Sequence, residues 1–178
     1  TKVKEVADFK EVKISKASTK HHPRHLKTFN VKNFDDAIKS RIPLFFNNDV
    51  IIHVAHIDKK MNYLYRNGHY DELFYIQYGN GVISTNYGNL SYKEGDYVVI
   101  PRGVIWKLNN KIKTKVLIIE STYPIETPGK YRNKFGQLLE SSPFCERDII
   151  TPTLVDPIDD INDYLVKVDR MSMAYSLE

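Results

Sequence analysis

The chain has 178 residues, of which 42% are hydrophobic and 27% are charged, a balance typical of a globular domain rather than a disordered chain. Its formal net charge is only +4 and no lysine and arginine run reaches five residues, so no nucleic-acid partner is expected. No apolar stretch approaches the roughly 18 residues that a membrane helix needs, so no membrane partner is expected either.

Two further features favour a cytoplasmic protein. The first residues, TKVKEVADFKEVKISK, are charged throughout and do not resemble a signal peptide. Cys145 is the single cysteine, so the chain cannot form an internal disulfide, which fits a reducing compartment.

Residues 1–30 are predicted to form an N-terminal arm, because they contain few large apolar residues and a polar centre, SKASTKHHPRH. One short strand is expected near residues 12–14. The histidines of HHPRH are interrupted by a proline, which breaks the helix on which an i, i+4 pair could bind a metal. We therefore interpret them as part of an exposed or interface loop.

The residues after the arm predict one helical turn and a first strand. In NFDDAIKS, Asn33 is expected to cap the turn, with Ala37 and Ile38 facing inward. The next stretch, RIPLFFNNDV, is an apolar strand that ends in an Asn-Asn-Asp turn.

From Val50 onward the pattern is that of an all-β protein. Apolar or alternating runs such as VIIHVAHI, ELFYIQY, VISTNY, YVVIP and KVLIIES are separated by turn signals. Asn80-Gly81 predicts a hairpin, and the spacing of about eight to ten residues between turns suits a barrel or sandwich. A Pro-rich stretch at about 122–145 is expected to be a long ordered loop.

Two segments after this loop are further strand candidates, DIITPTLV and a last strand within DDINDYLVKVDRMSMAY. No internal repeat divides the chain. We therefore predict a single β-barrel domain over residues 31–178, with the Pro-rich loop as part of it.

Two stretches resemble the paired motifs of cupins, which are small jelly-roll barrels. In cupins, G-x5-H-x-H-x3–4-E-x6-G and G-x5-P-x-G-x2-H-x3-N place three imidazoles and one carboxylate inside the barrel, where they hold a divalent metal. Here Gly95, Pro101 and Gly103 match the second motif, and Glu72 matches the carboxylate of the first. The resemblance implies a cupin-type jelly-roll fold.

The histidines of both motifs are missing. Trp106 stands at the histidine position of the second motif, and His69 lies only three residues before Glu72, which is the wrong spacing. Glu72, His69 and Trp106 are therefore candidate vestigial positions, and we expect neither a metal ligand set nor a catalytic residue in this chain.

For each of these side chains we prefer a structural interpretation to a functional one. Trp106 is expected to fill the barrel interior, although stacking on a ligand is the alternative. Glu72 is expected to be a hydrogen-bonded carboxylate at the rim. His53 and His56 are three residues apart in one strand and should face opposite sides.

Longer stretches resemble homogentisate 1,2-dioxygenase. They lie between about residues 21 and 157, and they are HHPRHLKTFN, RIPLFFNNDV, YLYRNGHYDELFYIQYGNG, YGNLSYKEGDYVVIPRG and LIIESTYPIETPGKYRNKFGQLLESSPFCERDI. That family opens the ring of homogentisate with O2 on Fe(II) to give maleylacetoacetate in tyrosine and phenylalanine breakdown. Its iron is held by two histidines and one glutamate of a second, C-terminal barrel.

The resemblance implies that this chain is the first, metal-free barrel, with a structural and assembly role. Its expected partners are the C-terminal iron-binding barrel, further copies in a homo-oligomer and, for the parent enzyme, a small aromatic acid substrate. Fe(II) belongs to the parent and no cofactor is expected in this chain. Two alternatives are a standalone metal-free cupin that binds a small ligand or a partner, and a purely structural assembly module.

Overall fold

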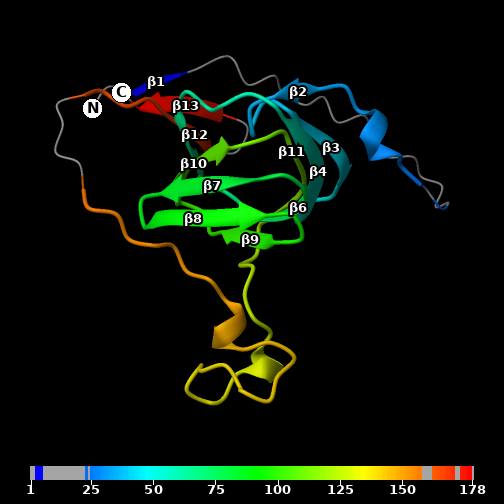
Figure 1. Ribbon diagram of the computed structural model, residues 1–178, viewed down its shortest axis with the longest axis vertical. Helices are drawn as coiled ribbons and strands as arrows, with labels where there is room; N and C mark the ends of the chain where they lie inside the picture. The colour runs from blue at the N-terminus through cyan, green and yellow to red at the C-terminus, as the bar shows by residue number, and fades with distance from the viewer. Residues whose placement is uncertain (1–2, 6–22, 24, 158–161, 171–172, 178) are drawn as a thin grey trace.

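Two facing β-sheets make up the body of the protein (Figure 1). The computed structural model describes residues 3–5, 23, 25–157, 162–170 and 173–177. In spatial order, sheet A contains β1 (Val3–Glu5), β13 (Met173–Leu177), β12 (Val166–Arg170), β5 (Leu64–Asn67), β10 (Ile105–Asn110), β7 (Asn80–Thr85) and β8 (Gly88–Lys93). Sheet B contains β2 (Phe34–Asp35), β4 (Val50–Ile57), β11 (Thr114–Ser121), β6 (Asp71–Tyr78) and β9 (Tyr97–Ile100), and β3 (Arg41–Phe46) pairs with β4.

The core lies between the two sheets, as strand periodicity requires. In β11 every second side chain, from Thr114 to Glu120, is buried, whereas the alternate ones are only partly buried. The pattern follows from the pleat, which points successive side chains to opposite faces. The inward residues of both sheets form one apolar cluster that includes Tyr65, Phe74 and Trp106. The prediction of an all-β barrel is confirmed.

The Asn80-Gly81 signal does not make a hairpin, so that prediction was wrong. β6 and β7 belong to different sheets, and the chain crosses between them at Gly79, whose φ is +107°. A Cβ there would lie 2.8 Å from the carbonyl oxygen of Lys113, so the crossing needs glycine for close approach as well as for its dihedral. The two-residue hairpin lies one step later, between β7 and β8.

The turn over residues 36–40 buries Ala37 and Ile38 as predicted, but Asn33 does not cap it. The Oδ1 atom of Asp36 accepts hydrogen bonds from the backbone N–H groups of Ile38 and Lys39. Asn33 instead donates from its side chain to the carbonyl of Lys39. Both residue types can cap, and the strand Phe34–Asp35 moves the start of the turn to Asp36.

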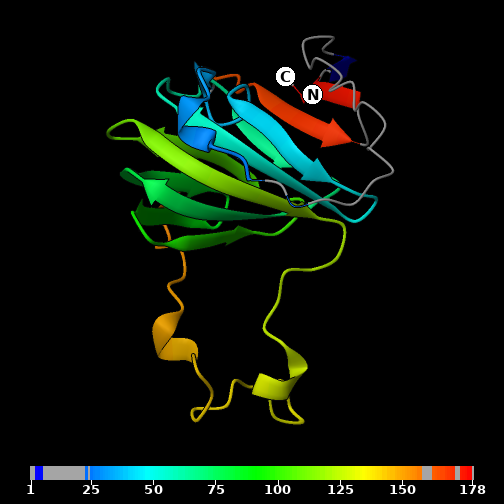
Figure 2. The ribbon, with the colours of Figure 1, turned by 90° about the vertical axis from the view of Figure 1, so that its right-hand side faces the viewer.

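After β11 the chain leaves the barrel in a long excursion, defined here as residues 122–157, which hangs away from the sheets (Figure 2). It contains two short 3-10 turns, η2 (Gly129–Tyr131) and η3 (Glu146–Asp148). On its return Thr153 forms an isolated bridge with Asn89 of β8. The Pro-rich loop is thus longer than the predicted 122–145. Apart from this bridge, the segment DIITPTLV does not form the predicted strand.

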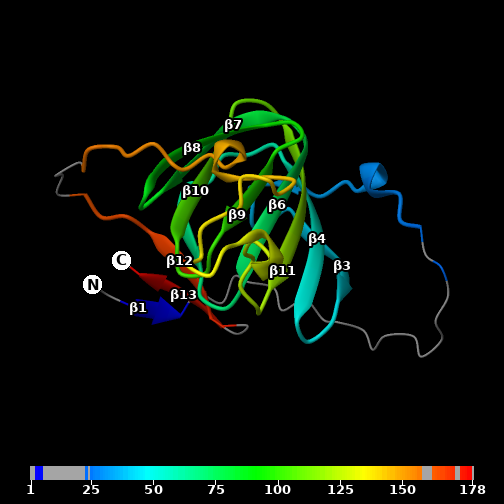
Figure 3. The same cartoon turned by 90° about the horizontal axis from the view of Figure 1, so that it is seen from below.

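The C-terminal segment forms two strands rather than the single one predicted. β12 and β13 pair antiparallel with each other, and β12 runs parallel to β5. β13 and β1 lie side by side at the far edge of sheet A (Figure 3).

A third 3-10 turn, η1 (Thr28–Asn30), lies in the described part of the N-terminal arm, where His25 is exposed. The strand expected near residues 12–14 and the pair His21 and His22 lie outside the described residues. In the described ranges no helix has the length and apolar character to cross a membrane. The division into an arm and one domain stays a prediction.

Candidate functional site

A cluster of charged side chains lies inside the barrel, where the cupin motifs would place a metal. Arg41 comes from β3, and the two carboxylates, Glu72 and Glu120, come from the neighbouring strands β6 and β11. These glutamates are direct cross-strand partners, so their side chains point to the same inward face. His53 of β4 points to that face as well, beside Glu120.

The Arg41 guanidinium bridges the two carboxylates. Its Nη1 atom lies 2.7 Å from Oε1 of Glu72 and 2.6 Å from Oε1 of Glu120. Its Nε–H donates to the backbone carbonyl of Ala37 at 3.1 Å, which ties the 36–40 turn to the cluster. The contact with Glu120 is a charge-assisted hydrogen bond, which is among the strongest polar contacts in proteins, and the contact with Glu72 is a close ion pair.

Each carboxylate has a second polar partner. The indole N–H of Trp106 donates to Oε2 of Glu72 at 3.0 Å. Nε2 of His53 lies 2.9 Å from Oε2 of Glu120, and the amide of Asn67 donates to Oε1 of the same glutamate at 3.3 Å. Each carboxylate therefore has Arg41 and at least one further donor beside it, while Oε1 of Glu72, Nη2 of Arg41 and Nδ1 of His53 have no hydrogen-bond partner among the described residues.

Aromatic rings enclose the guanidinium. The Arg41 carbon Cζ lies 5.6 Å from the centre of the Tyr65 ring and 5.7 Å from that of Phe74. Both rings meet the Trp106 indole edge to face, with centroids 5.4 and 5.5 Å away. Water is thus kept away from the ion pairs, which strengthens their attraction and raises the cost of losing either partner.

The environment shifts the pKa values of these groups in different directions. Burial, and then the charge of Glu120, raise the pKa of Glu72 above its ordinary value. Burial alone would raise the pKa of Glu120 too, but the hydrogen bond from His53 and the Arg41 charge hold it below its ordinary value. Burial alone would lower the pKa of Arg41, but the two carboxylates raise it, so the guanidinium stays charged.

The cluster does not fit a divalent metal. A metal would need the space between the carboxylates, and a permanently cationic guanidinium occupies that space. Among the described residues, no group of three or more histidine, cysteine or acidic side chains could hold a metal ion. Arg41 therefore places a positive charge between the two carboxylates, where a cupin that binds a metal has its cation.

The structure shows where each candidate residue from the sequence motifs lies. Trp106 is 0% exposed, so the prediction that it fills the interior is confirmed. Glu72 is also 0% exposed and lies in the core, so the prediction of a rim carboxylate was wrong. His69 is outside the cluster, with its ring 4.4 Å from that of Tyr70.

His53 and His56 face opposite sides, as predicted, because His56 binds the carbonyl of Val31 on the outer side. Motif spacing missed Arg41, His53 and Glu120 as parts of one site. The available signal was Arg41 at the start of an apolar strand and Glu120 within VLIIES, each an isolated charge in an apolar run.

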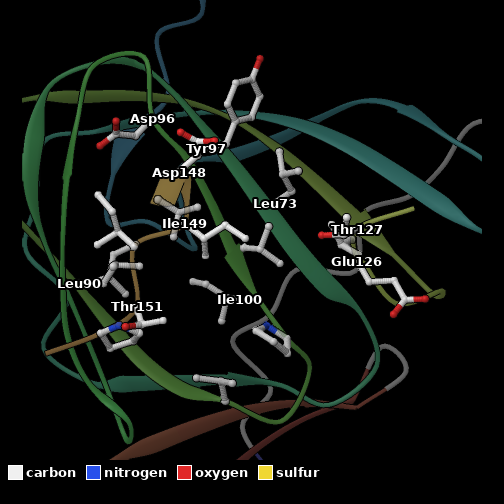
Figure 4. A pocket seen from close by; sticks show the side chains of 18 of the residues that line it. Leu73, Leu90, Asp96, Tyr97, Ile100, Glu126, Thr127, Asp148, Ile149 and Thr151 are labelled. Atoms are coloured by element: carbon white, nitrogen blue, oxygen red, sulfur yellow. The ribbon is translucent and has the colours of Figure 1, made fainter. Parts of the chain in front are cut away.

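A cavity of about 1120 Å3 lies between the excursion and the free edges of β8 and β9 (Figure 4). Its walls are mostly apolar and include Leu90 of β8, Ile100 of β9 and Ile149 of the excursion. Glu126 and Asp148 are among the polar residues at its walls. The volume would admit a small organic molecule.

Asp71 fixes the root of the excursion. Its Oδ1 atom accepts hydrogen bonds from the backbone N–H and the Nε–H of Arg102, and its Oδ2 atom accepts one from the N–H of Ile125 at 3.0 Å. Burial alone would raise its pKa, but the bonds from Arg102 and Ile125 hold the pKa below the ordinary aspartate range.

Asp71→Asn should therefore loosen the root of the excursion. An amide cannot accept all three hydrogen bonds as a carboxylate does, so we expect the Ile125 amide to exchange its hydrogen at least tenfold faster at pH 7, measured by mass spectrometry. Because the folded pKa is lowered, the carboxylate stabilises this contact above its unfolded pKa, and the wild type should lose protection only as the pH falls below about 4. Glu126→Gln, which alters an exposed pair with Arg132, is the control; equal exchange in both variants would contradict the assignment.

The two facing sheets, together with the glycines and proline of the second motif, define the class of the chain as a cupin-type domain. Solved structures of similar fold include a cupin-2 domain protein of Shewanella frigidimarina, with 26% identity and a TM-score of 0.42 over 46% of this chain and 79% of that one. Another is a protein of unknown function from Streptococcus pyogenes, with 18% identity and a TM-score of 0.44 over 62% and 99%.

Sequence comparison assigns the chain to one family within the cupin-type class. Residues 3–127 match the family model described as homogentisate 1,2-dioxygenase N-terminal, and the chain belongs to this family. A protein of Saccharolobus solfataricus named as a "putative dioxygenase" is 38% identical over 139 residues. The match covers 78% of this chain but 35% of the relative, so the chain spans about a third of that protein's length.

Proposed function

We propose that this chain is the metal-free first barrel of a homogentisate 1,2-dioxygenase-like enzyme that acts in cytoplasmic tyrosine and phenylalanine breakdown. The family match over residues 3–127 is the observation that carries the proposal. Fe(II), held by a second barrel, would supply the oxygen activation that opens the aromatic ring.

The buried cluster supports a structural role for the first barrel. Arg41, Glu72 and Glu120 come from three strands of one sheet and cross-link them at a point where a metal-binding cupin uses its ion. The aromatic enclosure leaves these groups without access to a substrate. This barrel therefore acts as a rigid support for the second barrel rather than as the place of the reaction.

Oxygen uptake tests the proposal. The chain alone, supplied with Fe(II) and homogentisate, should bind no stoichiometric iron and consume no O2. A chimera is then made in which this chain replaces the matching part of the Saccharolobus relative. The chimera should consume O2 with homogentisate and contain about one iron per chain. Phenylacetate, which lacks the ring hydroxyls, is the control substrate. Turnover by the isolated chain, or an iron-loaded chimera that is inactive while the unaltered relative is active, would refute the proposal.

A standalone binding role is the second candidate, and the cavity beside β9 is the observation that favours it. A ligand that binds only the folded state raises the melting temperature by mass action. A concentration-dependent rise with an aromatic acid or a sugar, abolished by Leu90→Trp within the cavity, would support this candidate. Unchanged melting across such a set would count against it.

A further inference from the structure

One side of β9 is a sheet edge without a strand partner. β9 is the last strand of sheet B beyond β6, and in the described part of the chain it pairs with no other strand. Its sequence, YVVI, contains neither lysine nor proline, the residues that proteins often place on edge strands to prevent further pairing. Tyr97 is 69% exposed and Val99 is 40% exposed. The geometry of this edge therefore suits the addition of a further strand.

Two other edges are protected against strand addition. The edge of sheet A at β8 pairs through Asn89 with Thr153 of the excursion, with backbone hydrogen bonds of 2.9 and 2.8 Å. A Cβ at Gly88 would lie 2.1 Å from the carbonyl oxygen of Thr153, so the excursion packs closely on that edge. β3 contains Pro43, where its register with β4 shifts. Among the described residues, β9 has neither kind of protection.

A bulge at the start of β9 shows which backbone groups point away from β6. The Gly95 N–H donates to the carbonyl of Ile76, and the Ile76 N–H donates to the carbonyl of Asp96. The φ of Gly95 is +89°, as in bulges whose first residue is a left-handed glycine. Hydrogen-bonded and non-hydrogen-bonded pairs then alternate along the antiparallel ladder. The N–H and C=O groups of Tyr97 and Val99 therefore point away from β6, toward the free edge.

The cavity of about 1120 Å3 runs along this edge. All four residues of β9 line it, the inward and the outward ones alike, so the cavity lies beside the strand rather than on one of its faces. The excursion forms the opposite wall with Ile125 and Ile149, and Leu90 of β8 is part of the inner wall (Figure 4). A strand added to β9 would place alternate side chains against these apolar walls.

The charged residues at the cavity walls are mostly acidic. They are Asp96, Glu126, Asp148 and Arg132, three negative charges and one positive, so their formal sum is −2. The side chain of Glu126 is 64% exposed and lies 3.4 Å from Arg132, and that of Asp148 is 42% exposed. These carboxylates attract a basic partner and repel a second acidic wall of the same kind, which disfavours a second copy of this edge as the occupant.

We propose that β9 and the excursion form a binding cleft for an extended peptide that has alternating apolar residues and basic residues at its ends. The peptide pairs with the free edge of β9 as an added strand, so main-chain hydrogen bonds supply affinity and the apolar walls select its side chains. The proposal rests on the second candidate function, a binding role for this cavity, and names the class of partner.

Fluorescence anisotropy with the intact 178-residue chain tests the proposal. The probe is the labelled peptide Arg-Val-Thr-Val-Thr-Val-Lys, which has basic ends and valine at every second position. It should bind in a saturable manner. Two altered peptides should bind at least tenfold more weakly. One has proline in place of the central valine, which removes a backbone donor, and the other has glutamate at both ends.

Variants of the protein test the same contacts. Val99→Pro removes an N–H that points away from β6 and leaves the hydrogen bonds to β6, so it should abolish binding without a change in the circular dichroism spectrum. Glu126→Lys reverses an exposed charge at the cavity wall and should weaken binding at least tenfold. Glu140→Lys is the matched control, because it makes the same change at an exposed position of the excursion that does not line the cavity. It should leave binding unchanged.

Several outcomes would overturn the proposal. They are no binding at millimolar peptide, equal binding of the proline peptide, and binding that persists in both Val99→Pro and Glu126→Lys. Self-association of the free chain that Val99→Pro abolishes would assign the edge to a second copy instead. A rise in melting temperature with an aromatic acid or a sugar, without peptide binding, would support the second candidate function and still reject the peptide, so the two failures are distinguishable.

Discussion

Arg41→Met is expected to lower the free energy of unfolding by about 3–5 kcal/mol at pH 7. Methionine can fill much of the space of the arginine side chain, but it leaves two carboxylates buried beside each other without a cation. Glu72 is 0% exposed and Glu120 is 6% exposed, so water cannot replace the lost partner without opening the barrel. The loss of Arg41 also frees the carbonyl of Ala37, which loosens the 36–40 turn.

The pH dependence separates this mechanism from ordinary loss of packing. In the wild type, the pKa of Glu120 is lowered, so the stability it contributes is present above its unfolded pKa and is lost as the pH falls. Without Arg41 the pKa values of both glutamates should rise well above their ordinary values. Protonation then relieves the repulsion, and the variant should become more stable on acidification from pH 7 to pH 5.

Urea unfolding at pH 7 and pH 5 measures both effects. Lys59→Met is the control, because Lys59 forms an exposed ion pair with Asp35 and its replacement should leave the unfolding midpoint unchanged at either pH. A loss below 1 kcal/mol in Arg41→Met, or a loss of the same size at both pH values, would show that the cluster does not bind the strands together.

Strand positions and their inward faces could be predicted from local patterns. The runs VIIHVAHI and KVLIIES are long and apolar enough to predict strands from local sequence alone. The inward position of Trp106 follows from its place in the second motif. His53 and His56 were assigned to opposite sides by periodicity alone. Each of these properties depends on neighbouring residues, which the sequence displays directly.

The charge cluster depends on contacts that the sequence does not display. Arg41 and Glu120 are 79 residues apart and meet only because β3 and β11 both pair with β4. The crossing at Gly79 likewise depends on the approach of Lys113, whereas the local Asn-Gly pair favours a hairpin. A lone carboxylate is costly to bury, so the sequence offers no reason to place Glu72 in the core; its burial depends on the cation that Arg41 supplies from a distant strand.

Trp106→Ala should be the most damaging single change on the β10 side of the core, at about 3–5 kcal/mol. The side chain is fully buried, and the rings of Tyr65 and Phe74 pack on it edge to face. Its removal leaves a cavity among rigid rings and takes the N–H donor from Glu72. Urea unfolding measures the loss, and Tyr87→Ala, which removes an exposed ring at the β7–β8 turn, is the control.

Trp106→Phe separates the packing of the indole from its hydrogen bond. Phenylalanine keeps most of the ring contacts but cannot donate to Oε2 of Glu72, so the expected loss is about 1–3 kcal/mol. Because Glu72 keeps Arg41 but loses a donor that stabilises its charged form, it is easier to protonate than before, and the loss should shrink from pH 7 to pH 5. In the wild type, the emission of Trp106, the single tryptophan, should be blue-shifted and poorly quenched by iodide. A solvent-like emission spectrum, or a Trp106→Phe protein as stable as the wild type, would mean that the indole neither fills the barrel nor supports Glu72.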